Sequence, residues 1–137
     1  FKKTGQRRDL NREKFEANNL IDLLKKFDSS ASKNISYLSQ VIKVRSRLKA
    51  FHPESYMKCL STNIANCVII QRGLVNDIVY IVCNFSDQYL DIPLINDPDF
   101  SMLCTKKDLI DNITGSHICT NPFRLNPYQV VWVSSTD

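Results

Sequence analysis

The sequence has no uninterrupted apolar run of about 18 residues, the length that a membrane-spanning helix needs. No signal peptide opens the chain. We therefore expect a cytoplasmic protein without a membrane partner. The chain begins at Phe1 instead of a methionine, which suggests a start trimmed from something longer.

Closely spaced metal ligands are also missing. The chain has five cysteines and two histidines but no Cys-x-x-Cys pair, and a zinc site needs closer ligand pairs. The cysteines lie in apolar, strand-like stretches, where a thiol behaves as a small buried hydrophobic group. We expect reduced thiols, no metal and no other cofactor, with a zinc site or a thiol nucleophile as the less favoured alternatives. The cysteines are Cys59, Cys67, Cys83, Cys104 and Cys119.

The charge is mildly basic, with a net value of +4. A length of 137 residues and an apolar content of 43% are ordinary for one globular domain, or a small domain with an appendage. Basic residues concentrate in the first third of the chain, but Asp9, Glu13 and Glu16 alternate with them. A nucleic-acid surface needs its cations on one face beside stacking aromatics. We expect a solvated basic surface and no nucleic-acid partner, and a basic nucleic-acid-binding module stays an alternative.

Helical spacing of apolar residues predicts two helices, over residues 18–27 and 31–49. The second helix ends before Pro53, because proline disfavours helical backbone in the residue that precedes it. The expected caps are Asn18 or Asn19 for the first helix and Ser30 or Ser32 for the second. The apolar stripe of the second helix consists of Ile35, Leu38, Val41, Ile42 and Leu48.

After Pro53, valine, isoleucine, tyrosine and cysteine become dense and helical spacing disappears. Such runs between turn signals predict several short strands, packed as a small antiparallel sandwich. Residues 73–77 are the expected loop of a hairpin. Residues 78–85 are apolar at nearly every position, which suggests a strand covered on both faces. The expected strands are 67–71, 77–85, 89–95 and 130–134, with shorter candidates at 57–60, 102–105 and 116–120.

Residues 5–12 read Gly-Gln-Arg-Arg-Asp-Leu-Asn-Arg, a polar run without helical or strand periodicity. The run resembles the loop after the eighth barrel strand of sucrose-phosphorylase-like enzymes in the α-amylase superfamily (glycoside hydrolase family 13). The family pattern there is Gly-x-x-Arg-Asp-Ile-Asn-Arg, and this chain departs from it at Leu10. Four later stretches resemble family motifs in the family's order: 45–51 (Arg-x-x-x-x-Ala-Phe), 82–86 (Val-x-Asn-x-Ser), 108–110 (Asp-Leu-Ile) and 125–133 (Leu-x-Pro-Tyr-x-x-x-Trp, then Val).

The resemblance covers the whole chain and implies an α+β fragment. Residues 1–53 would supply the end of a catalytic (β/α)8 barrel, as a loop and one or two helices, and residues 54–137 would form a C-terminal antiparallel β-sandwich domain. Enzymes of this kind are retaining α-glucoside phosphorylases of carbohydrate metabolism. Two carboxyl groups about 5 Å apart act as nucleophile and acid/base, and inorganic phosphate then takes the glucosyl unit. The double arginine favours glucosylglycerate or glucosylglycerol phosphorylases over sucrose phosphorylases.

The catalytic carboxylates of that family lie upstream of the loop at the start of this chain, and none of the 14 Asp and Glu residues matches them. We therefore expect no catalytic residue here and no activity of this chain alone. The resemblance implies that Arg12, and less strongly Arg8, binds phosphate or the sugar or sugar-acid acceptor in the complete enzyme. Guanidinium groups bind such groups in fixed geometry. Bracing of the loop is the alternative role for both arginines.

One alternative function is a freestanding carbohydrate-binding or structural β-sandwich. It would need exposed aromatic side chains on one sheet face, and the single tryptophan, Trp132, is expected in the core. We expect His52 at the corner between helix and strands, and His117 exposed in a turn region, with neither in catalysis.

Overall fold

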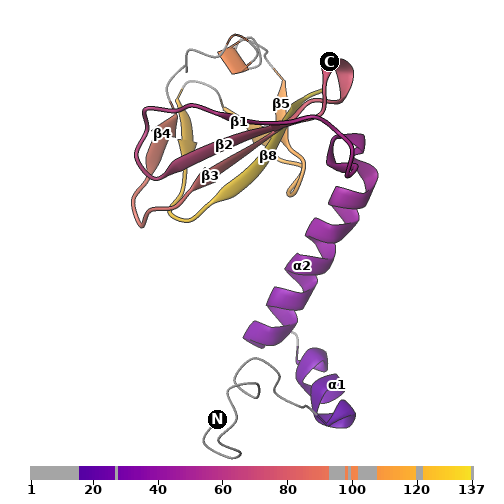
Figure 1. Cartoon of the computed structure of the whole chain (residues 1–137). Helices are drawn as coiled ribbons and strands as arrows, with labels where there is room; N and C mark the ends of the chain where they lie inside the picture. The colour runs from indigo at the N-terminus through magenta and orange to yellow at the C-terminus, as the bar shows by residue number, and fades with distance from the viewer. Residues whose placement is uncertain are drawn as a thin grey trace, which may run out of the picture. The chain divides into compact units, whose positions relative to one another are not determined.

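The computed structural model describes residues 16–26, 28–92, 98, 100–101, 108–119 and 122–136. The chain divides into two compact units, Phe1–Gln40 and Val41–Asp137, and the boundary falls inside the second helix. Within the described residues the fold is α+β, with two α-helices and an antiparallel sheet of six strands (Figure 1). The predicted domain boundary at residue 53 stays a prediction.

Neither predicted helix cap is correct. Asn18 and Asn19 lie within the first helix, and Glu16 precedes that helix without a capping side chain. At the start of the second helix the Ser29 hydroxyl accepts a hydrogen bond from the Ser32 N–H at 3.1 Å, because Ser29 is the residue directly before the first helical turn. No residue of either helix is buried. The helices are α1 (Ala17–Lys25) and α2 (Ser30–Arg47).

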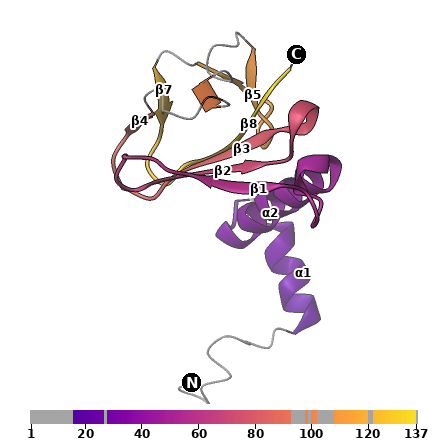
Figure 2. The same cartoon turned by 45° about the horizontal axis from the view of Figure 1, so that its top comes forward.

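Six strands form the larger sheet of the second unit, in the order β1-β2-β3-β8-β5-β6, and all neighbours pair antiparallel. Strands β4 and β7 form a separate antiparallel ribbon (Figure 2). The 3-10 turns are η2 (Lys49–Phe51) and η3 (Val75–Asp77). The strands are β1 (Met57–Leu60), β2 (Cys67–Arg72), β3 (Val79–Asn84), β4 (Leu90–Ile92), β5 (Leu109–Asp111), β6 (His117–Ile118), β7 (Phe123–Leu125) and β8 (Val130–Ser135).

The main core lies between the larger sheet and the ribbon, and both contribute side chains to it. Strand β2 alternates buried and half-buried residues, as expected where one face packs and the other is only partly covered. Strand β3 lies between β2 and β8 and is buried at five of its six positions, which confirms a strand covered on both faces. The core residues include Leu60, Ile69, Tyr80, Val82, Ile92, Leu109, Phe123, Leu125, Val131 and Val133.

A smaller cluster covers one end of the other sheet face. The buried residues Ala50, Val79, Ile113 and Trp132 form its centre, with Phe51 packed against them. Val41 and Val44 from the second half of α2, and Leu48 between α2 and η2, also pack there. The predicted helix stripe is therefore only partly buried, since Ile35, Leu38 and Ile42 are 44%, 57% and 56% exposed.

Most predicted strands in the described residues are confirmed, with ends that shift by one or two residues. The candidate at 102–105 and the last three residues of the candidate at 89–95 lie outside the described residues. The sequence did not predict β5 and β7. Each is only three residues long, and β7 lies between Pro122 and Pro127, so neither presents a run of alternating residues.

The predicted loop at residues 73–77 joins β2 to β3 and contains η3. Gly73 has a φ of +78°, and a Cβ placed on it would collide with the Asp77 carbonyl oxygen. Only glycine fits this position without moving the backbone. The hairpin therefore depends on Gly73 for its geometry.

Candidate functional site

Arg8 and Arg12, the residues expected to bind phosphate or the acceptor, lie outside the described residues. His52 and Trp132 lie where the sequence placed them, at the corner between helix and strands and in the core. His52 occupies the corner after η2, and its Nδ1 accepts a hydrogen bond from the Glu54 N–H at 3.3 Å. Trp132 is buried at 8% exposure, and His117 is exposed on β6.

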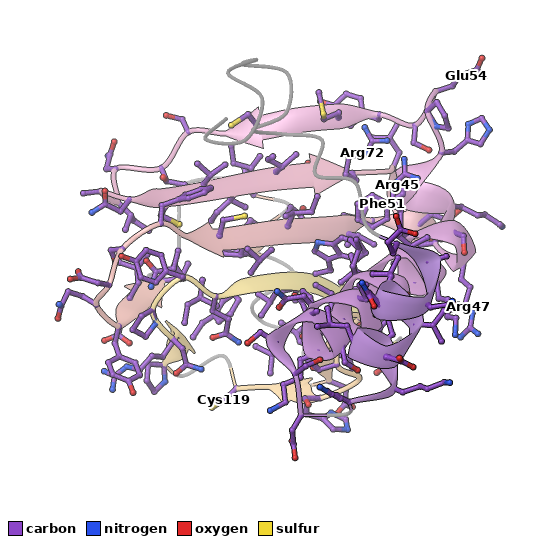
Figure 3. The ribbon with its side chains drawn as sticks, turned by 90° about the horizontal axis from the view of Figure 1, so that it is seen from below. Arg45, Arg47, Phe51, Glu54, Arg72 and Cys119 are labelled. Carbon is purple, nitrogen blue, oxygen red and sulfur yellow. The ribbon has the colours of Figure 1, made fainter. Side chains whose placement is uncertain are left out.

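A two-point polar contact lies at this corner between helix and sheet. Arg72, at the end of β2, donates from Nε to the Ala50 carbonyl at 3.1 Å and from Nη2 to the His52 carbonyl at 2.8 Å. The two bonds use the fixed fork of the guanidinium group to fasten η2 to the sheet. Figure 3 shows Arg72 and Phe51 at this end of the sheet, with Cys119 away from it.

Trp132 completes the corner from β8, which pairs with β3 on the side away from β2. The ring centroids of Phe51 and Trp132 are 4.4 Å apart, and the angle between the ring planes is 39°. The backbone N–H of Trp132 donates to Asp111 Oδ1 at 3.0 Å, and Asp111 Oδ2 accepts from the Thr114 hydroxyl at 2.8 Å. The corner is thus one packed unit of helix end, β2, β8 and the turn after β5. It has no room for a sugar ring on the indole.

Four exposed cations lie in the segment that leads into the corner: Lys43, Arg45, Arg47 and Lys49. Three of the four lie in the last turns of α2 and the fourth begins η2. Cations at a helix C-terminus are stabilised by the negative end of the helix dipole. Their placement therefore has a local structural cause and needs no bound ligand.

A pocket of about 360 Å³ lies between β6 and β7. Phe123, Leu125 and Val131 contribute buried apolar side chains to it, while His117 and Cys119 are exposed at its rim. The volume lies in the range of small-ligand sites. Other rim groups are already engaged within the protein: Arg124 pairs with Asp91, Gln129 Oε1 accepts from the Asn126 N–H, and Thr114 bonds to Asp111. This rim therefore offers few groups for a ligand's polar atoms.

The ion pair beside that pocket joins the two strands of the ribbon. Arg124 donates from Nε and Nη2 to the two carboxylate oxygens of Asp91, at 2.6 and 2.8 Å. These hydrogen bonds lower the pKa of Asp91, and the positive charge of Arg124 lowers it further. Both side chains are about half exposed, so the pair is a surface feature of β4 and β7.

The cysteines divide into two buried and two exposed ones, which corrects the expectation that all are buried. Burial raises the pKa of Cys67 to about 11, with a smaller contribution from Cys83, and burial also raises the pKa of Cys83. Cys59 on the edge strand β1 and Cys119 after the edge strand β6 are exposed. Cys104 lies outside the described residues. Among the residues that are described, no group of three His, Cys, Asp or Glu side chains is placed to hold a metal ion.

A second polar centre lies at the opposite end of the larger sheet. Asn84, the last residue of β3, is 1% exposed. Its Nδ2 donates to the carbonyls of Gln88 at 2.7 Å and Asn126 at 2.9 Å, and its Oδ1 accepts from the N–H and the hydroxyl of Ser86. One buried amide thereby holds together the loops that follow β3 and β7. Sequence reasoning placed Asn84 and Ser86 in a strand motif but did not predict this role.

Comparison with known proteins identifies no relative: no protein-family model matches the chain, and no curated protein matches it either. No α-helix in the part of the chain that the structure describes is both long and apolar enough to cross a membrane.

Proposed function

We propose that this chain is the C-terminal part of a retaining α-glucoside phosphorylase, of the sucrose-phosphorylase-like branch of the α-amylase superfamily. Residues 1–53 would close the catalytic barrel, and residues 54–137 would form the C-terminal domain that braces it. The catalytic carboxylates would come from upstream of this sequence, so the chain itself would be inactive. The acceptor would be fructose, glycerate or glycerol, and the proposal puts the enzyme in the cytoplasm.

The observation that carries the proposal is the contact between Phe51 and Trp132. Phe51 ends the stretch that resembles the family's last barrel helix, and Trp132 lies in the stretch that resembles its closing strand. Their rings are 4.4 Å apart, although the two stretches are distant in the sequence. Motif residues that pack on one another support a family resemblance better than motif residues scattered over a surface.

The other quoted stretches also meet at the closing strand. Asn84 donates to the Asn126 carbonyl, and the Tyr128 N–H donates to the Ser86 carbonyl at 3.0 Å. Strand β5, which carries the Asp-Leu-Ile stretch, pairs with β8. Four of the five stretches therefore share one set of contacts, as residues that define a domain's architecture would.

The helices support the same proposal through what they leave uncovered. Ile35, Leu38 and Ile42 on α2 are about half exposed, and no residue of α1 is buried. Apolar helix faces of this kind need a covering surface in a stable protein. In a complete phosphorylase the barrel sheet would provide it.

In the complete enzyme, Arg12 would bind phosphate or the acceptor at the barrel mouth, and Arg8 would assist it or brace the loop. A guanidinium fork binds a phosphate or carboxylate through two parallel hydrogen bonds. A loop that follows the last barrel strand lies on the face where barrel active sites are built.

The test begins with the natural reading frame upstream of Phe1. The proposal expects it to encode the rest of a barrel, which needs roughly 250 residues in all. The complete protein should release glucose 1-phosphate from sucrose, glucosylglycerate or glucosylglycerol in the presence of phosphate. Arg12→Ala should lower kcat/KM by more than about tenfold, the loss expected for one charge-assisted hydrogen bond.

Lys14→Ala is the matched control, since Lys14 is a cation of the same segment outside the quoted run. It should leave kcat/KM within about twofold of the wild type, because Lys14 lies outside the stretch that resembles the family's loop. A reading frame without an upstream barrel, or a complete protein that releases no sugar phosphate from these substrates, would reject the proposal.

A further inference from the structure

Three aromatic side chains are largely exposed at the end of the larger sheet opposite η2. Phe85, Tyr89 and Tyr128 are 62%, 66% and 68% exposed. The pairing register puts the end of β1, the start of β2, the end of β3 and the start of β8 at this end of the sheet. The turns that connect these strands gather there (Figure 1). We call residues 61–66, 85–89 and 126–129 the loop end. It is distinct from the corner at η2, where the only tryptophan is buried.

The backbone that carries these aromatics is held together by hydrogen bonds between the loops. The Phe85 N–H donates to the Asn66 carbonyl at 2.8 Å, and the Tyr128 N–H donates to the Ser86 carbonyl at 3.0 Å. The buried Asn84 amide bonds to the carbonyls beside Tyr89 and Pro127, those of Gln88 and Asn126. The three aromatics therefore stand on one connected scaffold, and little chain entropy remains to be lost when a ligand binds.

Tyr128 has a backbone φ of +55°, in the left-handed region that residues other than glycine and asparagine rarely occupy. Hydrogen bonds within the loop stabilise this conformation. The Gln129 N–H donates to the Asn126 carbonyl at 3.1 Å, and Gln129 Oε1 accepts from the Asn126 N–H. The loop thus holds an aromatic side chain outward at a position where glycine would be less strained. Strained residues of this kind concentrate at binding sites.

The loop end is almost uncharged. Asp87 is its only charged residue, and the nearby Arg124 and Asp91 neutralise each other as an ion pair. Amide and hydroxyl side chains surround the aromatics instead: Ser61, Thr62, Asn63, Asn66, Ser86, Gln88, Asn126 and Gln129. Nucleic acids and acidic peptides need cations, which this surface lacks. Its chemistry suits a neutral ligand with apolar ring faces and many hydroxyl groups.

The exposed area of the three aromatics is small compared with the area that a protein interface buries. Exposed to the extent given above, three such side chains present roughly 400 Å². A stable protein interface buries about 800 Å² on each partner. The aromatics alone therefore supply about half of that area, so a protein partner would also have to bury the polar side chains around them, whereas a sugar needs only the ring faces and a few hydrogen bonds.

We propose that the loop end binds a neutral carbohydrate, with Phe85, Tyr89 and Tyr128 against the apolar faces of the sugar rings and amide side chains on the hydroxyls. Asn66 and Gln88 are exposed and adjoin the aromatics, so they are the first candidates for those hydrogen bonds. The site involves neither the barrel loop nor any catalytic residue. The proposed carbohydrate site is therefore independent of the proposed phosphorylase function, and either can be rejected without the other.

The test titrates the full chain with maltohexaose and cellohexaose, two neutral glucose oligomers of different linkage. Backbone amide NMR spectra should show saturable shifts confined to the loop end with at least one of the two. Tyr128→Ala and Phe85→Ala should each weaken binding by about tenfold, as for a central aromatic of a small site. Tyr37→Ala is the matched control: Tyr37 is 55% exposed on α2, and its removal should leave the affinity unchanged.

Two results would overturn the inference. One is the absence of saturable binding to either oligomer with Kd below about 10 mM while the amide spectrum shows a folded chain. The other is a concentration-dependent dimer that Tyr128→Ala abolishes, which would make the loop end a contact between copies of the chain.

Discussion

The ring of Phe51 lies 4.4 Å from the ring of Trp132, at an angle of 39° between their planes. Phe51 belongs to the 3-10 turn after α2, and Trp132 belongs to the strand β8. This contact joins the helical end of the second unit to its sheet. Because the chain has one tryptophan, its fluorescence reports on this corner alone.

Phe51→Ala should lower the free energy of unfolding by about 2 kcal/mol, less than for a fully buried phenylalanine because Phe51 is half-buried. Phe51→Leu should recover more than half of that loss. Urea unfolding followed by circular dichroism measures both, since it does not depend on the changed tryptophan environment. Tyr56→Ala removes an aromatic that is 43% exposed nearby and should have a much smaller effect. Equal losses in the two alanine variants would show that the ring contact does not stabilise the corner.

Arg72→Lys should destabilise the chain by about 1 kcal/mol, because an ammonium group cannot reproduce the two hydrogen bonds in the geometry of the guanidinium fork. The bonds run to the carbonyls of Ala50 and His52. Arg45→Lys, on the exposed side of α2, should leave stability within about 0.5 kcal/mol of the wild type. Thermal unfolding of the two variants side by side measures the difference. A stable Arg72→Lys variant would mean that packing at η2, and not Arg72, holds the corner.

The Asp91–Arg124 pair predicts a defined dependence of stability on pH. The hydrogen bond from Arg124 lowers the pKa of Asp91 in the folded chain. The pair therefore stabilises the fold above the pKa of the unfolded chain, about 3.9, and this contribution is lost as the pH falls through the lowered folded value. Asp91→Asn should lower Tm at pH 7, and its difference from the wild type should shrink as the pH falls below about 3.9.

Asp87→Asn is the control for this pH series, since Asp87 is exposed on a neighbouring loop and forms no ion pair with Arg124. Its Tm difference from the wild type should stay small across the series. A constant difference for Asp91→Asn from pH 7 to about 2 would show that the pair does not act through its charges.

Thiol labelling should separate the cysteines by position. Burial raises the pKa of Cys67 to about 11, so at pH 8 about one molecule in a thousand carries the thiolate. Iodoacetamide should therefore label Cys59 and Cys119 quickly in the folded chain, and Cys67 and Cys83 only after unfolding in urea. Peptide mass spectrometry distinguishes the sites. Rapid native labelling of Cys67 would contradict the packing of β2 against the core.

Much of the fold is predictable from local patterns. The central strand β3 is recognisable because a run that is apolar at nearly every position is typical of a strand covered on both faces. The β2–β3 hairpin is recognisable from Gly73, Asn76 and Asp77, which are turn residues between two apolar runs. The strands β5 and β7 are not, because three-residue strands owe their pairing to partners remote in the sequence, β8 for one and β4 for the other.

The candidate sites divide in the same way. The motif stretches are visible in the sequence, but their contacts with one another are not. Phe85, Tyr89 and Tyr128 are scattered among polar residues, and only the pairing of β3, β4, β7 and β8 brings their loops together. The one signal that could have pointed to this place is Asn84, a polar residue that ends a strongly apolar strand and needs buried partners.

The sequence by itself determined the α+β class, the position of the helices and the central strands of the sheet, because residue spacing acts locally and repeats with the period of each element. Only the tertiary structure decided which cysteines are exposed, since β1 and β6 become edge strands through the strand order of the sheet. It also decided that Phe51 is the ring that packs on the buried tryptophan, and that three other aromatics remain exposed. Burial depends on what lies across the sheet, and that neighbour is chosen by the long-range pairing of strands.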